Sequence, residues 1–219
     1  MATTEERQFL PALRFKALTP YFDAFVRVTT RERAFKRRLL DQIELSSGDA
    51  ILDVGAGTGT LAILVKERWP DARVTGLDAD GEILSIARRK VSEAGREAEF
   101  VEALSTEMPF ADASFDAAVS TLFFHHLDRA SKERTLAELA RVLKPGGMLH
   151  VGDFGKGADP LQAALFLQVR TFDGFDVTAE NARGELPRLI ETADFEDVRS
   201  RGRMRTGIGT LELLSARRP

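Results

Sequence analysis

Three glycines at alternate positions, directly after a short apolar segment, constrain the fold of this chain more than any other feature. The segment reads Ile51-Leu-Asp-Val-Gly-Ala-Gly-Thr-Gly-Thr-Leu-Ala62, so the glycines are Gly55, Gly57 and Gly59. An apolar run, a glycine-rich turn and an apolar helix pattern predict a strand, a tight turn and a helix, a geometry that brings the backbone close to a polar ligand. Asp53 inside the strand disfavours a pyrophosphate and favours a cationic ligand.

Strand and helix patterns alternate through the middle of the chain. Strands are expected at 50–54, 73–78, 99–103, 115–121 and 148–152, and helices at 61–69, 82–94 and 132–143. This alternation predicts a parallel sheet with helices on both faces. Two later strand patterns, 198–204 and 210–216, predict a terminal hairpin. The expected fold class is α/β: a Rossmann-like, doubly wound, seven-stranded sheet, mostly parallel, with one antiparallel strand from the C-terminal hairpin.

Charge and composition exclude several classes of function. The net charge of −3 gives no global attraction to nucleic acid. The absence of cysteine excludes disulfides, thiolate metal sites and cysteine nucleophiles. We find no zinc-ligand spacing and expect no metal. A polar N-terminus and the absence of a long apolar run predict a cytoplasmic protein without stable membrane insertion. The oligomeric state is not readable from the sequence.

The glycine loop and three later motifs resemble the class I S-adenosylmethionine-dependent methyltransferases. Asp78 ends the second expected strand at a spacing that suits a carboxylate binding both ribose hydroxyls. Met108-Pro-Phe110 with the following Asp112–Asp116, and Leu143-Lys-Pro-Gly-Gly147, look like the family's approaches to strands four and five. The segment around Phe9–Tyr21 looks like the N-terminal cap of quinone-biosynthesis-type and related small-molecule methyltransferases.

The resemblance implies S-adenosyl-L-methionine as the cofactor and assigns residues to it. Asp53 would face the ammonium, directly or through water, above a glycine loop that carries the methionine part. Asp78 would accept the ribose hydroxyls, and Leu104 and Ser105 would lie beside the adenine. The full set of expected cofactor-binding residues is Asp53, Gly55, Ala56, Gly57, Gly59, Asp78, Ala79, Leu104, Ser105 and Thr121.

The length of 219 residues predicts a single methyltransferase domain. Within it we expect an N-terminal helical cap, a cofactor-binding core, a lid insertion, and a last helix with the terminal hairpin; these are residues 1–48, 49–154, 155–183 and 184–219. The cap and the insertion lie outside the alternating pattern. They are expected to form a helical lid over the carboxyl ends of the strands, where open α/β sheets bind ligands.

The resemblance also implies acceptor-side residues after strands four and five and in the cap, namely His125, His126, Asp153 and Tyr21. In the family, one histidine of such a pair often borders the methyl-transfer pocket; bridging loop and helix is the alternative role. Asp153 could orient a substrate or take a proton, or it could fix a loop. Tyr21 could reach the ligands or pack within the lid. His150, inside a strand, is interpreted as buried with satisfied hydrogen bonds.

The expected function is methyl transfer by in-line displacement to oxygen, nitrogen or carbon of a small molecule, without a nucleic-acid partner. Phenylalanines gather in the lid segments, so the acceptor is expected to be hydrophobic or aromatic. A nicotinamide-dependent oxidoreductase is one alternative, although Thr60 replaces the glycine that its loop requires and Asp53 would repel a pyrophosphate. A non-catalytic relative that binds the cofactor is the other.

Leu104 departs from the family pattern, since many relatives carry an aspartate there that meets the adenine amino group. Leucine cannot accept this hydrogen bond, so we predict weaker cofactor binding than in those relatives. Calorimetric titration of Leu104→Asp with S-adenosylmethionine is expected to show tighter binding than the wild type. Unchanged affinity would contradict the prediction.

Overall fold

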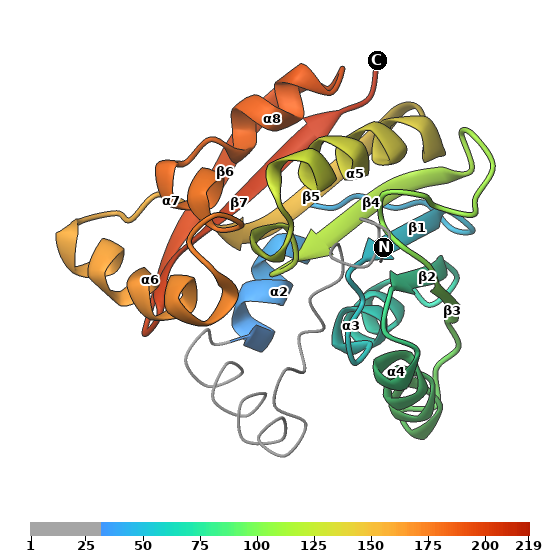
Figure 1. The fold of residues 1–219 in the computed structure, drawn as a ribbon. Coiled ribbons are helices and arrows are strands. Elements are labelled where there is room, and N and C mark those ends of the chain that lie inside the picture. The colour runs from blue at the N-terminus through green and yellow to red at the C-terminus, as the bar shows by residue number, and fades with distance from the viewer. Residues whose placement is uncertain (1–31) are drawn as a thin grey trace, which may run out of the picture.

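The structure is a computed structural model that describes residues 32–219, and it contains one twisted sheet between two layers of helices (Figure 1). The order of the seven strands is β3-β2-β1-β4-β5-β7-β6. Their bounds are β1 Ala50–Val54, β2 Arg73–Asp78, β3 Glu99–Glu102, β4 Phe115–Thr121, β5 Leu143–Phe154, β6 Glu196–Thr206 and β7 Gly209–Arg217.

Helices cover both faces of this sheet. Their bounds are α2 Glu32–Leu40, α3 Thr60–Arg68, α4 Gly81–Glu93, α5 Arg129–Val142, α6 Pro160–Asp173, α7 Ala179–Arg183 and α8 Leu186–Thr192, with a short 3-10 helix η2 at Phe124–His126. One core layer joins α2, α3, α4 and α6 to the sheet, and the other joins α5 and α8 to its opposite face, as Figure 1 shows. No helix in the described range is long and apolar enough to span a bilayer.

The strands explain why both layers form. Along β1, Ile51 packs into one core layer and Leu52 and Val54 into the other, because successive side chains of a strand point to opposite faces. All five residues of β1 are buried. Such continuous burial is typical of a central strand in a parallel sheet.

The strand order reverses at β1 and β4, which are neighbours in the sheet. β2 and β3 extend the sheet on one side of β1, and β4 and β5 extend it on the other, all of them parallel. Connections that leave in opposite directions open a ligand-binding position at the carboxyl ends of the two adjacent strands. The glycine loop follows β1, and η2 lies just beyond β4. The fold therefore brings both segments to one edge of the sheet.

The terminal hairpin confirms the expected fold class. β7 is antiparallel to both of its neighbours, β5 and β6. Its two-residue turn lies between Thr206 and Gly209, and the Thr206 hydroxyl donates to the carbonyl of Gly209 at 2.7 Å. The single antiparallel strand therefore lies inside the sheet, and β6 forms its edge.

Two elements differ from the sequence predictions. β5 begins at Leu143, earlier than the expected start at 148, because Gly146 and Gly147 pair with Arg218 through N–H···O bonds of 2.9 Å each. These bonds extend the sheet into a segment expected to be only a turn. Between helix patterns at 159–172 and 184–193 the sequence predicts a loop, but the structure contains α7 there. Its five residues are too short for apolar periodicity to reveal.

A buried ion pair holds α7 against α5. Lys132 Nζ lies 2.9 Å from the Glu180 carboxylate and donates to the carbonyl of Val177 at 2.5 Å. The exposed fractions of the two side chains are 0% and 6%. The amide of Asn181 adds a hydrogen bond to the carbonyl of Phe154 at the end of β5. These contacts fix the segment that follows α6.

We predict that Glu180→Gln lowers the free energy of unfolding by about 3 kcal/mol, because the Lys132 ammonium would stay buried without its charge partner. Urea denaturation at neutral pH measures this change. Glu185→Gln is the matched control, since Glu185 forms an ion pair with Arg183 at 2.9 Å with both side chains well exposed. It should cost no more than about 0.5 kcal/mol. Equal losses in the two variants would refute the prediction.

Candidate functional site

The glycine loop after β1 depends on left-handed backbone conformations. Gly55, Gly57 and Gly59 have φ values of 75°, 51° and 71°, which side-chain-bearing residues rarely adopt. The N–H groups of Gly55 and Ala56 both donate to the carbonyl of Leu77, at 2.8 and 3.0 Å. A Cβ at Gly57 would meet nothing within 4 Å, so this part of the loop is open to a ligand.

Asp78 fixes the loop from the end of β2. Its Oδ2 accepts from the N–H of Gly57 at 2.9 Å, and its Oδ1 accepts from the N–H of Asp80 at 3.1 Å. Burial raises the pKa of Asp78, and these backbone hydrogen bonds oppose the increase. Each carboxylate oxygen has a second lone pair, so Asp78 can still accept two hydroxyl groups.

Asp53 is a buried carboxylate to which no described residue donates a hydrogen bond. Only 2% of the residue is exposed, and neither side-chain oxygen has a hydrogen bond within the described chain. Burial raises the pKa of Asp53 from 3.8 to about 7; the charge of Lys36 on α2 opposes this increase and that of Asp78 adds to it. A buried, unpartnered carboxylate is costly unless a ligand satisfies it. A cationic or hydrogen-bond-donating ligand fits this position.

The other expected cofactor residues have different environments. Ala56 and Thr121 are buried, whereas 47% of Leu104 is exposed. The Ser105 hydroxyl is buried and shares a 2.8 Å hydrogen bond with the hydroxyl of Thr135 on α5. Ala79 follows Asp78 directly and is half-buried. The expected adenine contacts at Leu104 and Ser105 remain predictions.

Phe123 connects the glycine loop to the segment after β4. A Cβ built on Gly55 would lie 2.4 Å from the Phe123 ring, so only glycine allows this ring to pack so closely. Leu122, just before it, has φ 54°, which is unfavourable for a branched side chain. The loop and the turn before η2 therefore contact each other directly.

Asp153 at the end of β5 organises η2. Its Oδ2 accepts from the N–H groups of Phe123 and His125, at 3.1 and 3.3 Å, and its Oδ1 accepts from the N–H of Phe154 at 2.6 Å. The same Oδ1 lies 2.7 Å from His125 Nδ1. These four contacts use the accepting capacity of the carboxylate. They favour the loop-fixing role for Asp153 over direct contact with a substrate.

His125 is buried and held in one orientation. The Asp153 contact assigns the proton of a neutral ring to Nδ1 and leaves the Nε2 lone pair facing away from β5. Burial by itself would lower the pKa of His125, but the charge and hydrogen bond of Asp153 outweigh burial, so the pKa is raised. Burial would likewise raise the pKa of Asp153, and the His125 contact keeps it lowered.

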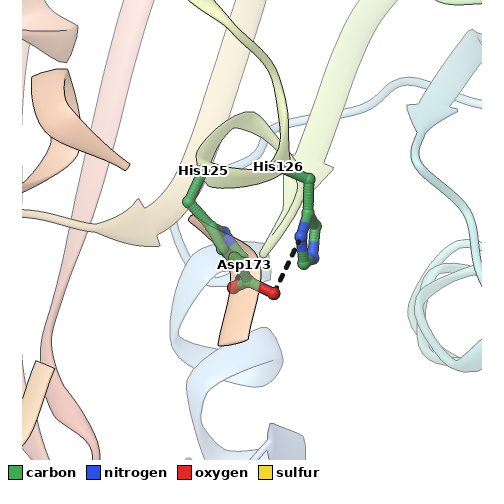
Figure 2. A group of neighbouring side chains, drawn as sticks. All are labelled: His125, His126 and Asp173. Carbon is green, nitrogen blue, oxygen red and sulfur yellow. Dashed lines mark ion pairs between the residues drawn. The ribbon is translucent and has the colours of Figure 1, made fainter. Parts of the chain in front are cut away.

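His126 and Asp173 complete the group, as Figure 2 shows. Asp173, the last residue of α6, extends its carboxylate between the two rings. Its oxygens lie 3.7 Å from His125 Nε2 and 3.6 Å from His126 Nδ1. The exposed fraction of the side chain is 19% for Asp173 and 39% for His126. The end of α6 therefore meets the residues that follow β4.

The structure brings together three of the four expected acceptor-side residues, His125, His126 and Asp153. Tyr21 and the expected cap up to residue 31 lie outside the described residues. Asp173 was missed because nothing in the sequence connects an acid in the expected lid with a histidine pair far before it. His150 is buried within β5, as expected, but the described residues offer no hydrogen-bond partner to its Nδ1.

Comparison with known sequences identifies relatives. A family model described as a methyltransferase domain matches residues 51–147. The demethylmenaquinone methyltransferase of Thermus thermophilus is 38% identical over 159 residues, which cover 70% of this chain and 71% of that protein. The chain spans 63% of the demethylmenaquinone methyltransferase of Deinococcus radiodurans at 34% identity. It spans 90% of the ubiquinone/menaquinone biosynthesis C-methyltransferase of Syntrophotalea carbinolica at 28% identity.

Comparison with solved structures gives the same fold. The YcgJ protein of Bacillus subtilis superposes with a TM-score of 0.69 at 18% identity, over 85% of this chain and 98% of that chain. Phosphoethanolamine N-methyltransferase 2 of Haemonchus contortus, in complex with S-adenosyl-L-methionine, superposes with a TM-score of 0.68 at 15% identity, over 85% of this chain and 52% of that chain. At such identities the likeness concerns the fold alone.

The raised pKa of Asp53 predicts pH-dependent stability of the ligand-free protein. Between pH values of about 4 and 7 the folded state binds more protons than the unfolded state, so stability is lost as the pH rises through about 7. Asp53→Asn should therefore be more stable than the wild type at pH 8, by about 2 kcal/mol. Urea denaturation at pH 5 and pH 8 measures this difference, with the exposed Asp71→Asn as control. A loss between the two pH values that is the same in wild type and Asp53→Asn would exclude the effect.

Proposed function

Because this chain belongs to the class I S-adenosylmethionine-dependent methyltransferases, we propose that it methylates a ring carbon of a small, apolar hydroquinone. Membership of the family establishes the enzyme class, and the cofactor is S-adenosyl-L-methionine. The acceptor is the proposed part. The observation that carries it is the group of His125, His126 and Asp173, which lies next to apolar side chains at the edge that also bears the cofactor loop.

The residues present fit this cofactor. Asp53 offers a buried carboxylate without a partner to the amino group, and Asp78 offers free lone pairs to the ribose hydroxyls. The open backbone at Gly57 leaves room between these two acids. The cofactor supplies a methyl group on a sulfonium, whose carbon–sulfur bond breaks as the acceptor carbon bonds to the methyl carbon. The protein's task is alignment and exclusion of water.

Two observations support a hydroquinone acceptor. Curated relatives of this chain are named for demethylmenaquinone and for ubiquinone/menaquinone biosynthesis. Large apolar side chains near Asp173 are exposed, with exposed fractions of 79% for Phe172, 51% for Phe175 and 47% for Leu167. An apolar ring and side chain could cover such surface. The reduced dihydroxy ring is the form with an electron-rich carbon.

Carbon methylation of a hydroquinone releases one proton overall, because the ring carbon exchanges its hydrogen for the methyl group. A polar group that stabilises the ionised hydroxyl therefore promotes attack by the ring carbon. In this proposal His125 Nε2, His126 and Asp173 face that hydroxyl. Asp153 is a positioning residue, since it orients His125 and its own oxygens are already engaged.

Neither alternative from the sequence is favoured. A nicotinamide-dependent oxidoreductase would place a pyrophosphate near Asp53, and a buried carboxylate repels it. A non-catalytic cofactor-binding relative has no need of a histidine fixed by a buried aspartate. The enzymes that the sequence comparison finds are methyltransferases by name.

Turnover assays with a panel of hydroquinones, phenols and amines test the proposal. We expect formation of S-adenosylhomocysteine with hydroquinones that carry an apolar side chain, and a product methylated at carbon by mass spectrometry and NMR. His125→Gln should lower kcat by about 100-fold or more, because it removes the Nε2 lone pair, with cofactor affinity within about twofold of the wild type. His150→Gln, at the third histidine, is the matched control and should retain activity. Product only with amines or simple phenols would overturn the hydroquinone assignment.

A further inference from the structure

We propose that His125, His126 and Asp173 bind a divalent transition-metal ion on the acceptor side of the site. These three residues come from two separate segments, η2 and the end of α6, and each offers one ligand atom. The three atoms lie within 4.8 Å of one another. Figure 2 shows the carboxylate of Asp173 directed toward both rings.

The distances fit a shared ion better than direct hydrogen bonds. The Asp173 oxygens lie 3.7 Å from His125 Nε2 and 3.6 Å from His126 Nδ1, both beyond hydrogen-bond length. Ligands bound about 2.0–2.2 Å from one ion stand roughly 3–3.5 Å apart. A contraction of a few tenths of an ångström would bring these two pairs to that spacing. The two distances run to different oxygens of Asp173, and the three ligand atoms, which lie within 4.8 Å of one another, would also have to draw together around the ion.

The contact between Asp153 and His125 is a second observation that supports a metal site. The Asp153 carboxylate lies 2.7 Å from His125 Nδ1, so a neutral ring carries its proton on Nδ1 and directs an unprotonated Nε2 toward Asp173. A carboxylate behind the imidazole is the usual arrangement around a metal-bound histidine, where it fixes the ring and raises its basicity. Three backbone N–H groups hold Asp153 in turn, so the position of His125 Nε2 is set before any ion arrives.

The ligand set indicates the class of ion. Two imidazole nitrogens and one carboxylate oxygen suit zinc, iron, cobalt or nickel, whereas magnesium and calcium prefer oxygen ligands. Three protein ligands leave coordination positions open. In a role that rests on the proposed function, an acceptor hydroxyl would bind there and ionise more easily. No metal is expected from the sequence, because the third ligand is far from the histidine pair along the chain.

Metal binding can be measured without cofactor or acceptor. The full chain is freed of metal with a chelator and titrated with Zn²⁺ by calorimetry, and with Co²⁺ by visible absorption. We expect one tight equivalent of Zn²⁺ per chain, a rise in melting temperature, and Co²⁺ bands from nitrogen and oxygen ligands. Asp173→Asn and His126→Gln should each weaken Zn²⁺ binding by about tenfold or more. His126 is well exposed, so its variant should fold.

Asp176→Asn is the matched control, because this exposed acid lies shortly after Asp173 and outside the group. It should bind Zn²⁺ like the wild type. The inference is overturned if the wild type binds no more Zn²⁺ than Asp173→Asn, or if Asp176→Asn weakens binding as much. Methyl transfer without metal binding would refute the metal site and leave the proposed function standing. Metal binding without any methyl transfer to hydroquinones would remove only the proposed acceptor.

Discussion

The hydrogen bonds that Asp153 accepts hold together the segment after β4 that contains His125 and His126. This carboxylate, at the end of β5, receives two N–H groups from the turn after β4 and the Nδ1 contact of His125. The same turn carries Phe123, whose ring packs on Gly55 of the cofactor loop. The orientation of His125 and the position of the turn that packs on the loop therefore both depend on one buried side chain.

Two buried aspartates at this edge of the sheet have pKa values that are shifted in opposite directions. Asp153 has four donors and a pKa held low by His125, whereas Asp53 has no hydrogen-bond partner in the described chain and a pKa raised by burial to about 7. Groups within the fold satisfy the hydrogen-bonding capacity of Asp153, which therefore has a structural role. Asp53 has no such hydrogen-bond partner among the described residues, and its burial costs free energy unless a ligand satisfies it. Burial alone therefore does not tell the two roles apart.

The sequence predicts most of this fold because its signals are local. The glycine loop, the apolar strand of Phe115–Thr121 and the terminal hairpin each carry their own pattern over a few residues. The early start of β5 depends on pairing with Arg218, and α7 depends on the ion pair to Lys132. Asp173 joins the site only through packing of α6. Such long-range contacts leave no periodic trace in a single sequence, which is why the sequence predicts the glycine loop but not the approach of Asp173 to the two histidines.

The position of β7 has a consequence for how the molecule is made. β7 lies between β5 and β6, yet it is the last of the seven strands along the chain. During synthesis β6 emerges first and has no strand to pair with, while β5 exposes the edge that β7 will later occupy. Unpaired edges of this kind favour association with other chains. The sheet therefore stays incomplete between β5 and β6 until β7 has been synthesised.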